Sequence, residues 1–251
     1  MNHVTIAQFS DCHLFSTKDG MHYGHNVFTN LSRVLAQLAN IDYLHAAIFT
    51  GDLTQDHSVA SYQLFNQAVI ESNLSCPVYW LAGNHDEFQL LSEHLTAKNI
   101  QQDKNIIIND WCLQLIDSKS STPAGLVSET QLNRIRNIST ESENTLIFMH
   151  HHAIDVDYFI DKHGLKNQME FWRAVSQNSS IKAICCGHIH RGLNIAEDDL
   201  HSAPLYTCPA TSIQFDPKVD SVAALNIGPG YRLLKLFSNG RIETSINHLS
   251  K

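Results

Sequence analysis

Five short polar clusters, each directly after an apolar run, constrain this chain more than any other feature. The runs occupy residues 4–9, 46–50, 78–82, 146–149 and 181–186, and their aliphatic and β-branched residues are typical of buried strands. The clusters are Asp11-Cys12-His13, Gly51-Asp52, Gly83-Asn84-His85-Asp86, His150-His151-His152 and Gly187-His188-Ile189-His190. Ligands bind beyond the carboxyl ends of strands in open α/β sheets, so we expect the five clusters to meet at one sheet edge.

The clusters contain the side chains that divalent metal ions of intermediate softness accept. Seven donors are available: Asp11, His13, Asp52, Asn84, His150, His188 and His190. This set is too large for one four-coordinate ion and suits two ions that share a ligand. Asp52 is the best bridge, because a carboxylate has two oxygens and the preceding Gly51 lets the backbone turn sharply.

The motifs D-x-H, G-D, G-N-H-[DE], H and G-H-x-H, in that order, resemble the signature of the calcineurin-like metallophosphoesterases. The chain is most similar to the bacterial class III 3′,5′-cyclic-AMP phosphodiesterases. That similarity continues in Gly51-Asp52-Leu53-Thr54-Gln55-Asp56, Asp161-Lys162-His163-Gly164-Leu165-Lys166-Asn167, Gln214-Phe215 and Pro229-Gly230-Tyr231-Arg232. One departure is Ala153, since the family usually has Pro within a few residues of this metal-binding histidine.

The resemblance implies a role for each site residue. One metal would be held by Asp11, His13, Asp52 and His190, and the other by Asp52, Asn84, His150 and His188. An iron or manganese pair is typical of such proteins, and zinc is an alternative. Substrate would contact His13, Asp52, Asn84, His85 and His190, with Asp52, Asn84 and His85 also serving catalysis. The family pattern puts the ligand first among the three consecutive histidines, at His150; the alternative is that all three are surface histidines.

The function that this resemblance implies is hydrolysis of 3′,5′-cyclic AMP to 5′-AMP. A hydroxide bridging the two metals would attack the phosphorus in line. His85 would donate a proton to the departing 3′ oxygen, and Asp86 would set the tautomer of His85. Two alternatives remain open. One is a metallophosphoesterase for other nucleotide diesters or phosphomonoesters, and the other is a non-catalytic, metal-dependent binding protein.

Helical patterns alternate with the apolar runs, at residues 27–39, 59–71, 88–97, 129–137 and 168–175. This alternation predicts an α/β fold with β-α-β crossovers and largely parallel strands. From about residue 193 the pattern changes to short strands with turn signals, which predicts that a second, more antiparallel half-sheet begins there. The resemblance implies a four-layer αββα sandwich of two mixed sheets with the helices outside. We expect residues 1–251 to form a single domain.

Composition narrows the choice of partner. Seventeen Lys and Arg residues against 25 Asp and Glu give a net charge of 17 − 25 = −8, so bound metals must supply the positive field for a phosphate ester. An acidic chain without a Lys/Arg-rich run argues against nucleic acid as a partner. No leader precedes the first strand and no apolar stretch is long enough to span a membrane, which predicts a cytoplasmic protein. The sequence leaves a monomer and a homodimer equally open.

Several further residues have two interpretations. His22, Tyr23, Gly24 and His25 are either a rim that contacts substrate or solvated loop residues, with the second favoured. Asp161, His163 and Asn167 form either a wall of the substrate pocket or a fixed loop. Gln55 and Asp56 are candidates for orienting the ligands near Asp52. Asp117 and Ser118 are expected to end a strand. Cys12, like the other five scattered cysteines, is expected to be a buried thiol that points away from the metals.

Overall fold

Two six-stranded sheets form the centre of the molecule. The structure is a computed structural model that describes residues 3–138, 143–198 and 200–250. The first sheet has the order β14-β13-β1-β4-β5-β6, formed by β1 (His3–Phe9), β4 (Leu44–Phe49), β5 (Val78–Trp80), β6 (Ile100–Gln101), β13 (Gly230–Phe237) and β14 (Ile242–His248). The second has the order β11-β12-β10-β9-β8-β7, formed by β7 (Asn105–Ile108), β8 (Trp111–Leu115), β9 (Asn144–Met149), β10 (Ile181–Cys186), β11 (Asn194–Ile195) and β12 (Leu205–Thr207). Each sheet has a parallel centre, with antiparallel pairs at one margin of the first sheet and at both margins of the second.

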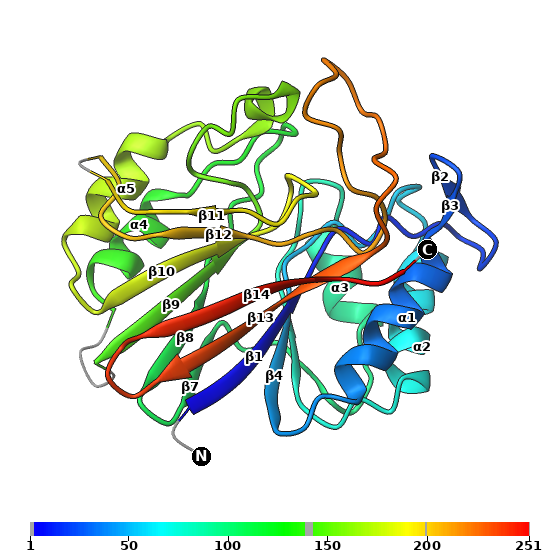
Figure 1. Ribbon diagram of the computed structural model, residues 1–251, viewed down its shortest axis with the longest axis horizontal. Coiled ribbons are helices and arrows are strands. Elements are labelled where there is room, and N and C mark those ends of the chain that lie inside the picture. The colour runs from blue at the N-terminus through cyan, green and yellow to red at the C-terminus, as the bar shows by residue number, and fades with distance from the viewer. Residues whose placement is uncertain (1–2, 139–142, 199, 251) are drawn as a thin grey trace.

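Helices cover the outer faces of the two sheets (Figure 1). Beside the first sheet lie α1 (Val27–Ala39), α2 (Val59–Glu71) and α3 (Phe88–His94), and beside the second lie α4 (Glu129–Arg136) and α5 (Gln168–Ser176). A small hairpin, β2 (Met21–His22) and β3 (His25–Asn26), precedes α1, and a 3₁₀ helix, η1 (Phe159–His163), precedes α5. The predicted four-layer αββα sandwich is therefore confirmed.

The alternation of side chains along the strands explains the layers. In β1, Val4 and Ile6 belong to the hydrophobic cluster between the two sheets, whereas Ala7 and Phe9 belong to the cluster under the helices. Successive side chains of a strand point to opposite faces, so a central strand of such a sandwich must be apolar on both. This requirement is the physical reason that the runs are largely apolar on both faces rather than alternating; the polar Thr5 and Gln8 of β1 are themselves buried.

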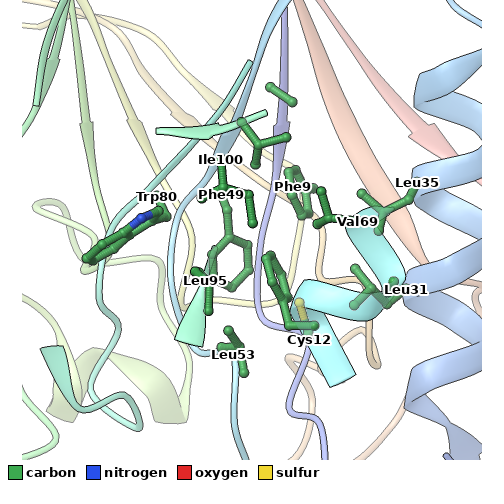
Figure 2. Packing of buried hydrophobic residues seen from close by; sticks show 14 of the residues in the cluster. Phe9, Cys12, Leu31, Leu35, Phe49, Leu53, Val69, Trp80, Leu95 and Ile100 are labelled. Atoms are coloured by element: carbon green, nitrogen blue, oxygen red, sulfur yellow. The ribbon is translucent and has the colours of Figure 1, made fainter. Parts of the chain in front are cut away.

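A hydrophobic cluster between the first sheet and its helices packs beneath the sheet edge at which the polar clusters are expected. Figure 2 shows Phe9 and Phe49 in one cluster with Leu31 of α1 and Val69 of α2. The Phe9 and Phe49 rings have centroids 5.3 Å apart, and both side chains are fully buried. Truncating a buried Phe of this kind to Ala typically costs about 3–5 kcal/mol, so these side chains fix β1 and β4 relative to each other.

The predicted helices are present, with small differences at their ends. Two of them, α1 and α2, match the predicted residues 27–39 and 59–71. The third ends at His94 rather than at residue 97, because Leu95 has left the helical conformation. Within the described residues, no helix is both long enough and apolar enough to cross a lipid bilayer.

The predicted start of the second sheet, near residue 193, is wrong. That sheet begins at β7, and its strands β7 to β12 span residues 105–207. The last two strands, β13 and β14, return to the first sheet, where β13 pairs antiparallel with β1. Turn signals and periodicity identify strands, but they carry no information on which distant strand is the hydrogen-bonding partner.

Candidate metal centre

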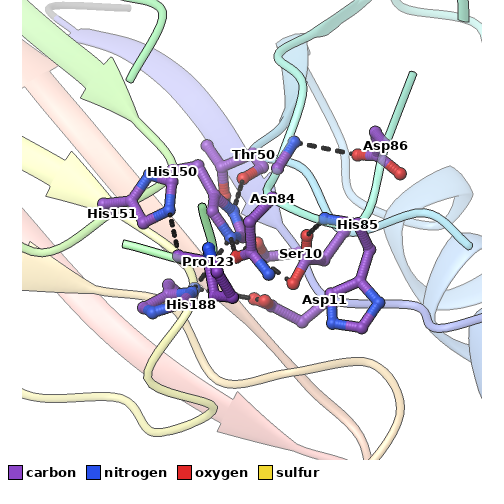
Figure 3. Close-up of polar contacts among 12 residues, drawn as sticks. Ser10, Asp11, Thr50, Asn84, His85, Asp86, Pro123, His150, His151 and His188 are labelled. Carbon is purple, nitrogen blue, oxygen red and sulfur yellow. Dashed lines mark hydrogen bonds and ion pairs between the residues drawn. The ribbon is translucent and has the colours of Figure 1, made fainter. Parts of the chain in front are cut away.

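The five polar clusters meet at one edge, where the strands of both sheets end. Asp11 and His13 follow β1, Asp52 follows β4, and Asn84 and His85 follow β5; His150 follows β9, and His188 and His190 follow β10. Backbone hydrogen bonds join neighbouring clusters: the Asp11 N–H donates to the Gly51 carbonyl at 2.9 Å, and the Gly187 N–H donates to the His150 carbonyl at 3.1 Å. Figure 3 shows side chains from both sheets converging on one point.

The first group of donor atoms surrounds Nε2 of His13. This nitrogen lies 3.0 Å from Nε2 of His190 and 3.7 Å from Oδ2 of Asp52. Nε2 of His190 in turn lies 3.5 Å from Oδ1 of Asp11. All four side chains are buried.

The second group surrounds Nε2 of His150. This nitrogen lies 3.1 Å from Oδ1 of Asn84, 3.1 Å from Nδ1 of His188 and 3.4 Å from Oδ2 of Asp52. Oδ2 of Asp52 therefore lies within reach of both groups. The structure thus brings together all seven donors that the sequence singled out, with Asp52 between the two sets.

These distances fit metal ions. Nitrogen and oxygen ligands of zinc-like ions lie about 2.1 Å from the metal, so two ligands of one ion are at most about 4.2 Å apart. Every pair measured above meets that limit. The donor set, made of imidazole nitrogens, carboxylates and one amide oxygen, also suits iron, manganese or zinc.

Hydrogen bonds on the far side of three imidazoles aim the remaining nitrogen at the centre. The Nδ1–H of His13 donates to Oε1 of Gln55 at 2.9 Å, and the same group of His190 donates to the Ile213 carbonyl at 2.9 Å. The Nδ1–H of His150 donates to the Thr50 carbonyl at 2.7 Å. Because each partner is an oxygen acceptor, Nδ1 carries a proton in all three rings, and Nε2 is the nitrogen that faces the candidate metal centre.

The backbone at the site is held in a conformation that side chains other than Gly rarely adopt. Five donors have positive φ angles: Asp11 (57°), His13 (49°), Asp52 (57°), His188 (68°) and His190 (52°). Residues with positive φ angles raise the free energy of the folded state, and they cluster at functional sites. The close approach of the Asp52 side chain to the backbone of Gly83 is a second constraint. A Cβ on Gly83 would lie 2.1 Å from Oδ1 of Asp52, so only glycine fits at this position.

Burial sets the protonation of most donors. It lowers the pKa of His13 and of His188 well below the ordinary range and that of His190 to about 3, so these imidazoles are neutral, which is the form that binds metal. Burial also raises the pKa of the Asp11 carboxyl to about 7. A cation against Asp11 would reverse that shift, since bound metals favour the charged form of a carboxylate.

Asp52 and His150 form a coupled pair in the middle of the site. Burial alone would raise the pKa of Asp52, but the charge and hydrogen bond of His150 outweigh it and place the pKa well below its ordinary value. Burial likewise opposes charge on His150, yet the Asp52 carboxylate raises the pKa of His150 to about 9. The bridging position therefore holds a carboxylate even before a metal is considered.

The other two histidines of the triplet are buried and are engaged elsewhere. His151 lies within ligand distance of His150 and His188, but its Nδ1 accepts from Ser118 Oγ at 2.8 Å and its Nε2–H donates to the Pro123 carbonyl at 3.1 Å. His152 donates through Nε2 to Oδ1 of Asp161 at 3.2 Å. The alternative of three surface histidines is wrong, because all three are fully buried.

The predicted role of Asp86 is wrong. Its carboxylate accepts hydrogen bonds from the N–H groups of Leu53 at 2.8 Å and Gly83 at 2.9 Å, and so ties together the loops after β4 and β5. The Nδ1 atom of His85 is buried without a hydrogen-bond partner in the described structure. His85 is placed instead through its backbone, whose N–H donates to Oδ1 of Asp52 at 2.9 Å.

The residues with two interpretations divide as follows. Gln55 orients His13, as expected, whereas Asp56 accepts from the Ser16 and Ser58 N–H groups and fixes its loop. Cys12 is buried in the hydrophobic cluster of Figure 2, as predicted. The favoured solvated-loop interpretation is wrong for His22, whose ring stacks on His13 with centroids 5.4 Å apart.

A cavity of about 430 Å³ opens onto the donors. His163 lines it, whereas Asp161 and Asn167 fix loops through bonds to the backbone of Val156 and Val127. The cavity is lined by His13, Asp52, Asn84, His85, Pro123, Phe159, Ile160, Lys162, His163, His188, His190, Phe215, Ser221 and Val222. Its polar floor and largely apolar wall are usual for a small-molecule site.

Sequence reasoning missed the contacts made by Phe215 and by the Thr50 and Ile213 carbonyls. Phe215 stacks on the ring of His190, and the two carbonyls accept from His150 and His190. Gln214-Phe215 belongs to the residues that resemble the subfamily, so it carried a signal. A backbone carbonyl leaves no signal in the sequence, because every residue has such a carbonyl.

A donor set of this kind, at the edge of an αββα sandwich, defines a metal-dependent hydrolase. The chain belongs to the calcineurin-like phosphoesterase family, whose model matches residues 4–192. It is 49% identical over 247 residues to a probable cyclic nucleotide phosphodiesterase of Colwellia psychrerythraea, covering 97% of this chain and 94% of the relative. It is 33% identical to the 3′,5′-cyclic adenosine monophosphate phosphodiesterase CpdA of Vibrio vulnificus, covering 99% and 91%.

Solved structures support the fold. A dimetal phosphatase from Danio rerio superimposes with a TM-score of 0.67 at 14% identity, covering 98% of this chain and 99% of that one. A purple acid phosphatase from yellow lupin superimposes with a TM-score of 0.61 at 10% identity, covering 99% of this chain and 54% of that one. At such low identities the likeness concerns the architecture alone.

Proposed function

We propose that this chain is a two-metal phosphodiesterase that hydrolyses 3′,5′-cyclic AMP to 5′-AMP. The observation that carries the proposal is the position of Oδ2 of Asp52, which lies 3.7 Å from Nε2 of His13 and 3.4 Å from Nε2 of His150. One carboxylate oxygen within reach of both donor groups suits a pair of ions with a shared ligand. The names of the curated relatives support the cyclic nucleotide as substrate.

We assign Asp11, His13, Asp52 and His190 to one metal and Asp52, Asn84, His150 and His188 to the other, with iron, manganese or both as the metals and zinc as the alternative. When bound, such a pair supplies an activated water at neutral pH and neutralises the phosphate oxygens. Since the whole chain carries a net charge of −8, this local positive charge is what would draw in an anionic ester.

The chain's own contribution to the reaction is to place His85. The ring of His85 lines the cavity and stands edge-on to His13, with centroids 5.0 Å apart. Because the ring lines the cavity, it is placed where the leaving oxygen of a substrate can take a proton from it. We assign His85 to donating a proton to the 3′ oxygen as the P–O3′ bond breaks, which leaves the phosphate on the 5′ oxygen.

A substrate panel tests the proposal. The purified protein would be loaded with Mn²⁺ or Fe²⁺ and given cyclic AMP, cyclic GMP, bis(p-nitrophenyl) phosphate and 5′-AMP. We expect cyclic AMP to yield 5′-AMP with little or no 3′-AMP, and 5′-AMP to be stable. Turnover of monoesters alone would favour a phosphomonoesterase. Metal and nucleotide binding without turnover of any ester would favour the binding protein.

Three further expectations belong to this proposal. The first is a single domain over residues 1–251, and the second is a monomer or homodimer that binds neither nucleic acid nor membrane. The third is a cytoplasmic location, for which the six buried free cysteines are compatible with a reducing compartment.

A further inference from the structure

A separate hydrophobic cluster lies over the metal centre, outside the three clusters that hold the sheets and helices. Its buried members are Ile160, Ile189, Ile213 and Phe215. Phe159 and Val222 pack against it and are half-buried. The cluster joins η1 to the segment after β12, and its members Phe159, Ile160, Phe215 and Val222 face the cavity. It forms one wall of the candidate site.

Contacts between neighbouring rings give that wall an order from the metal ligands outward. Phe215 stacks on the His190 imidazole with centroids 3.9 Å apart and 5° between the planes. The Phe159 ring follows, 5.3 Å from that of Phe215. Nζ of Lys162 comes last, 5.8 Å from the centroid of Phe159. Two aromatic rings therefore separate Lys162 from the nearest ligand along the wall.

The wall is attached directly to the metal-binding segments. The hydroxyl of Tyr158, next to Phe159, donates to the carbonyl of Ile189, which lies between His188 and His190. Asp161 within η1 accepts from Nε2 of His152 and from the N–H groups of Val156 and Tyr158. These bonds hold the backbone of Phe159 and Lys162 at a fixed place relative to the ligands, which reduces the ordering cost of binding.

Exposure and charge distinguish the two ends of the wall. Phe215 is 6% exposed and one face of its ring is covered by His190, whereas Phe159 is half-buried. Lys162 is the one lysine or arginine among the described residues that line the cavity. The outer end of the wall therefore presents an aromatic ring beside a cation.

We propose that Phe159 and Lys162 form a nucleobase subsite, in which the base of a 3′,5′-cyclic nucleotide packs on Phe159 while Lys162 donates to acceptor atoms on the base edge. This inference rests on the proposed function. A substrate whose phosphate lies at the donors must extend its sugar and base along the cavity. Of the two phenylalanines that line the cavity, Phe159 is the one whose ring is not covered by a ligand imidazole. Stacking of one base on an aromatic side chain is typically worth about 5- to 150-fold in affinity.

Lys162 gives the subsite a preference among bases. Its ammonium is a donor only. Guanine offers two adjacent acceptors, N7 and O6, whereas adenine places an amino donor beside its N7. The subsite should therefore accept cyclic GMP at least as readily as cyclic AMP, and the preference for guanine should depend on Lys162.

The experiment compares substrates that share the reacting bond and differ in the base. Cyclic AMP, cyclic GMP and an abasic 3′,5′-cyclic ribose phosphate would be tested with the Mn²⁺-loaded parental enzyme and with Phe159→Leu, Phe159→Tyr and Lys162→Met. Phe88→Leu and Lys235→Met, at exposed positions that do not line the cavity, are matched controls. Metal content and melting temperature would be measured for every variant.

We expect Phe159→Leu to lower kcat/KM for both cyclic nucleotides at least about fivefold and to leave the abasic substrate unchanged, with Phe159→Tyr near the parental values. Lys162→Met should lower kcat/KM for cyclic GMP more than for cyclic AMP. Equal kcat/KM for the nucleotides and the abasic substrate in the parental enzyme would overturn the subsite, as would equal losses on all three in both variants. Absence of turnover of every cyclic phosphate by the loaded parental enzyme would instead overturn the proposed function.

Discussion

Phe215 lies flat against the imidazole of His190, while the carbonyl of Ile213, two residues earlier, accepts the Nδ1–H of the same ring at 2.9 Å. One short segment therefore fixes both the plane of His190 and the nitrogen that faces the metal centre. Groups that hold a metal ligand in this way reduce the entropy lost when the ligand binds and set its tautomer.

Phe215→Leu should weaken metal binding, because the leucine fills part of the space but does not hold the imidazole plane. We expect the affinity for the more weakly bound metal to fall about 10- to 100-fold, the usual effect of changing a group that orients a metal ligand. Competition with a chromophoric chelator measures it. Phe159→Leu is the matched control, since it removes a ring of the same cluster that lies against Phe215 rather than His190. Equal affinities in the two variants would show that Phe215 only fills space.

The donor residues of the candidate metal centre could be predicted from the sequence because they follow strands that are recognisable as buried. Residues 46–49 and 183–186 are apolar without alternation, so both faces are covered and their carboxyl ends must reach the same edge. Glycines mark the points of close approach, as where Gly83 borders Asp52. The residue types then identify the candidate donors, whereas their division between two metals is what the family resemblance implies.

Other features could not be predicted, for reasons that are also physical. The pairing of β13 with β1 joins residues more than 200 positions apart, and local patterns do not encode such pairs. Asp86 neighbours His85 in the chain, yet in this tight turn its carboxylate points back to the Gly83 and Leu53 N–H groups. Adjacency in sequence is therefore a poor guide to side-chain contact in a turn.

Asp52→Ala should abolish binding of both metals, because it removes the carboxylate that lies between the two donor groups. Elemental analysis of protein purified without chelator should find well under one metal per chain, against up to two in the parental protein. Asp56→Ala, four residues away, is the control: its carboxylate accepts from the Ser16 and Ser58 N–H groups and holds the loop, so its metal content should be parental. An Asp52→Ala protein with two metals and the parental rate would contradict the bridging position.

Lys104 should make stability depend on pH. Burial lowers the pKa of this lysine from 10.5 to about 8 in the fold, where its ammonium lies 3.6 Å from the centroid of the Trp80 ring. Between pH 8 and 10.5 the unfolded chain binds more protons than the folded one, so this group favours the fold more as pH rises. The free energy of unfolding of the parental protein, measured in urea, should therefore rise from pH 7.5 to 10 relative to that of Lys104→Met. The exposed Lys98→Met should show no such divergence, and parallel curves for Lys104→Met would contradict the shift.

His85 should act on the leaving oxygen and not on the metals, because its ring lines the cavity while Asn84 supplies the donor atom from this loop. His85→Ala should keep the parental metal content. Loss of a positioned general acid typically costs about 10² to 10⁴ in rate, but only where the leaving oxygen needs a proton. Hydrolysis of cyclic AMP, which expels an alkoxide, should therefore fall steeply, whereas bis(p-nitrophenyl) phosphate, whose leaving group departs as a stable anion, should lose much less. His94→Ala is the control, since His94 lies in the last turn of α3 and does not line the cavity; both substrates should stay near the parental rates. Equal losses on both substrates in His85→Ala would assign His85 to binding the phosphate, and a loss of metal would place it among the ligands.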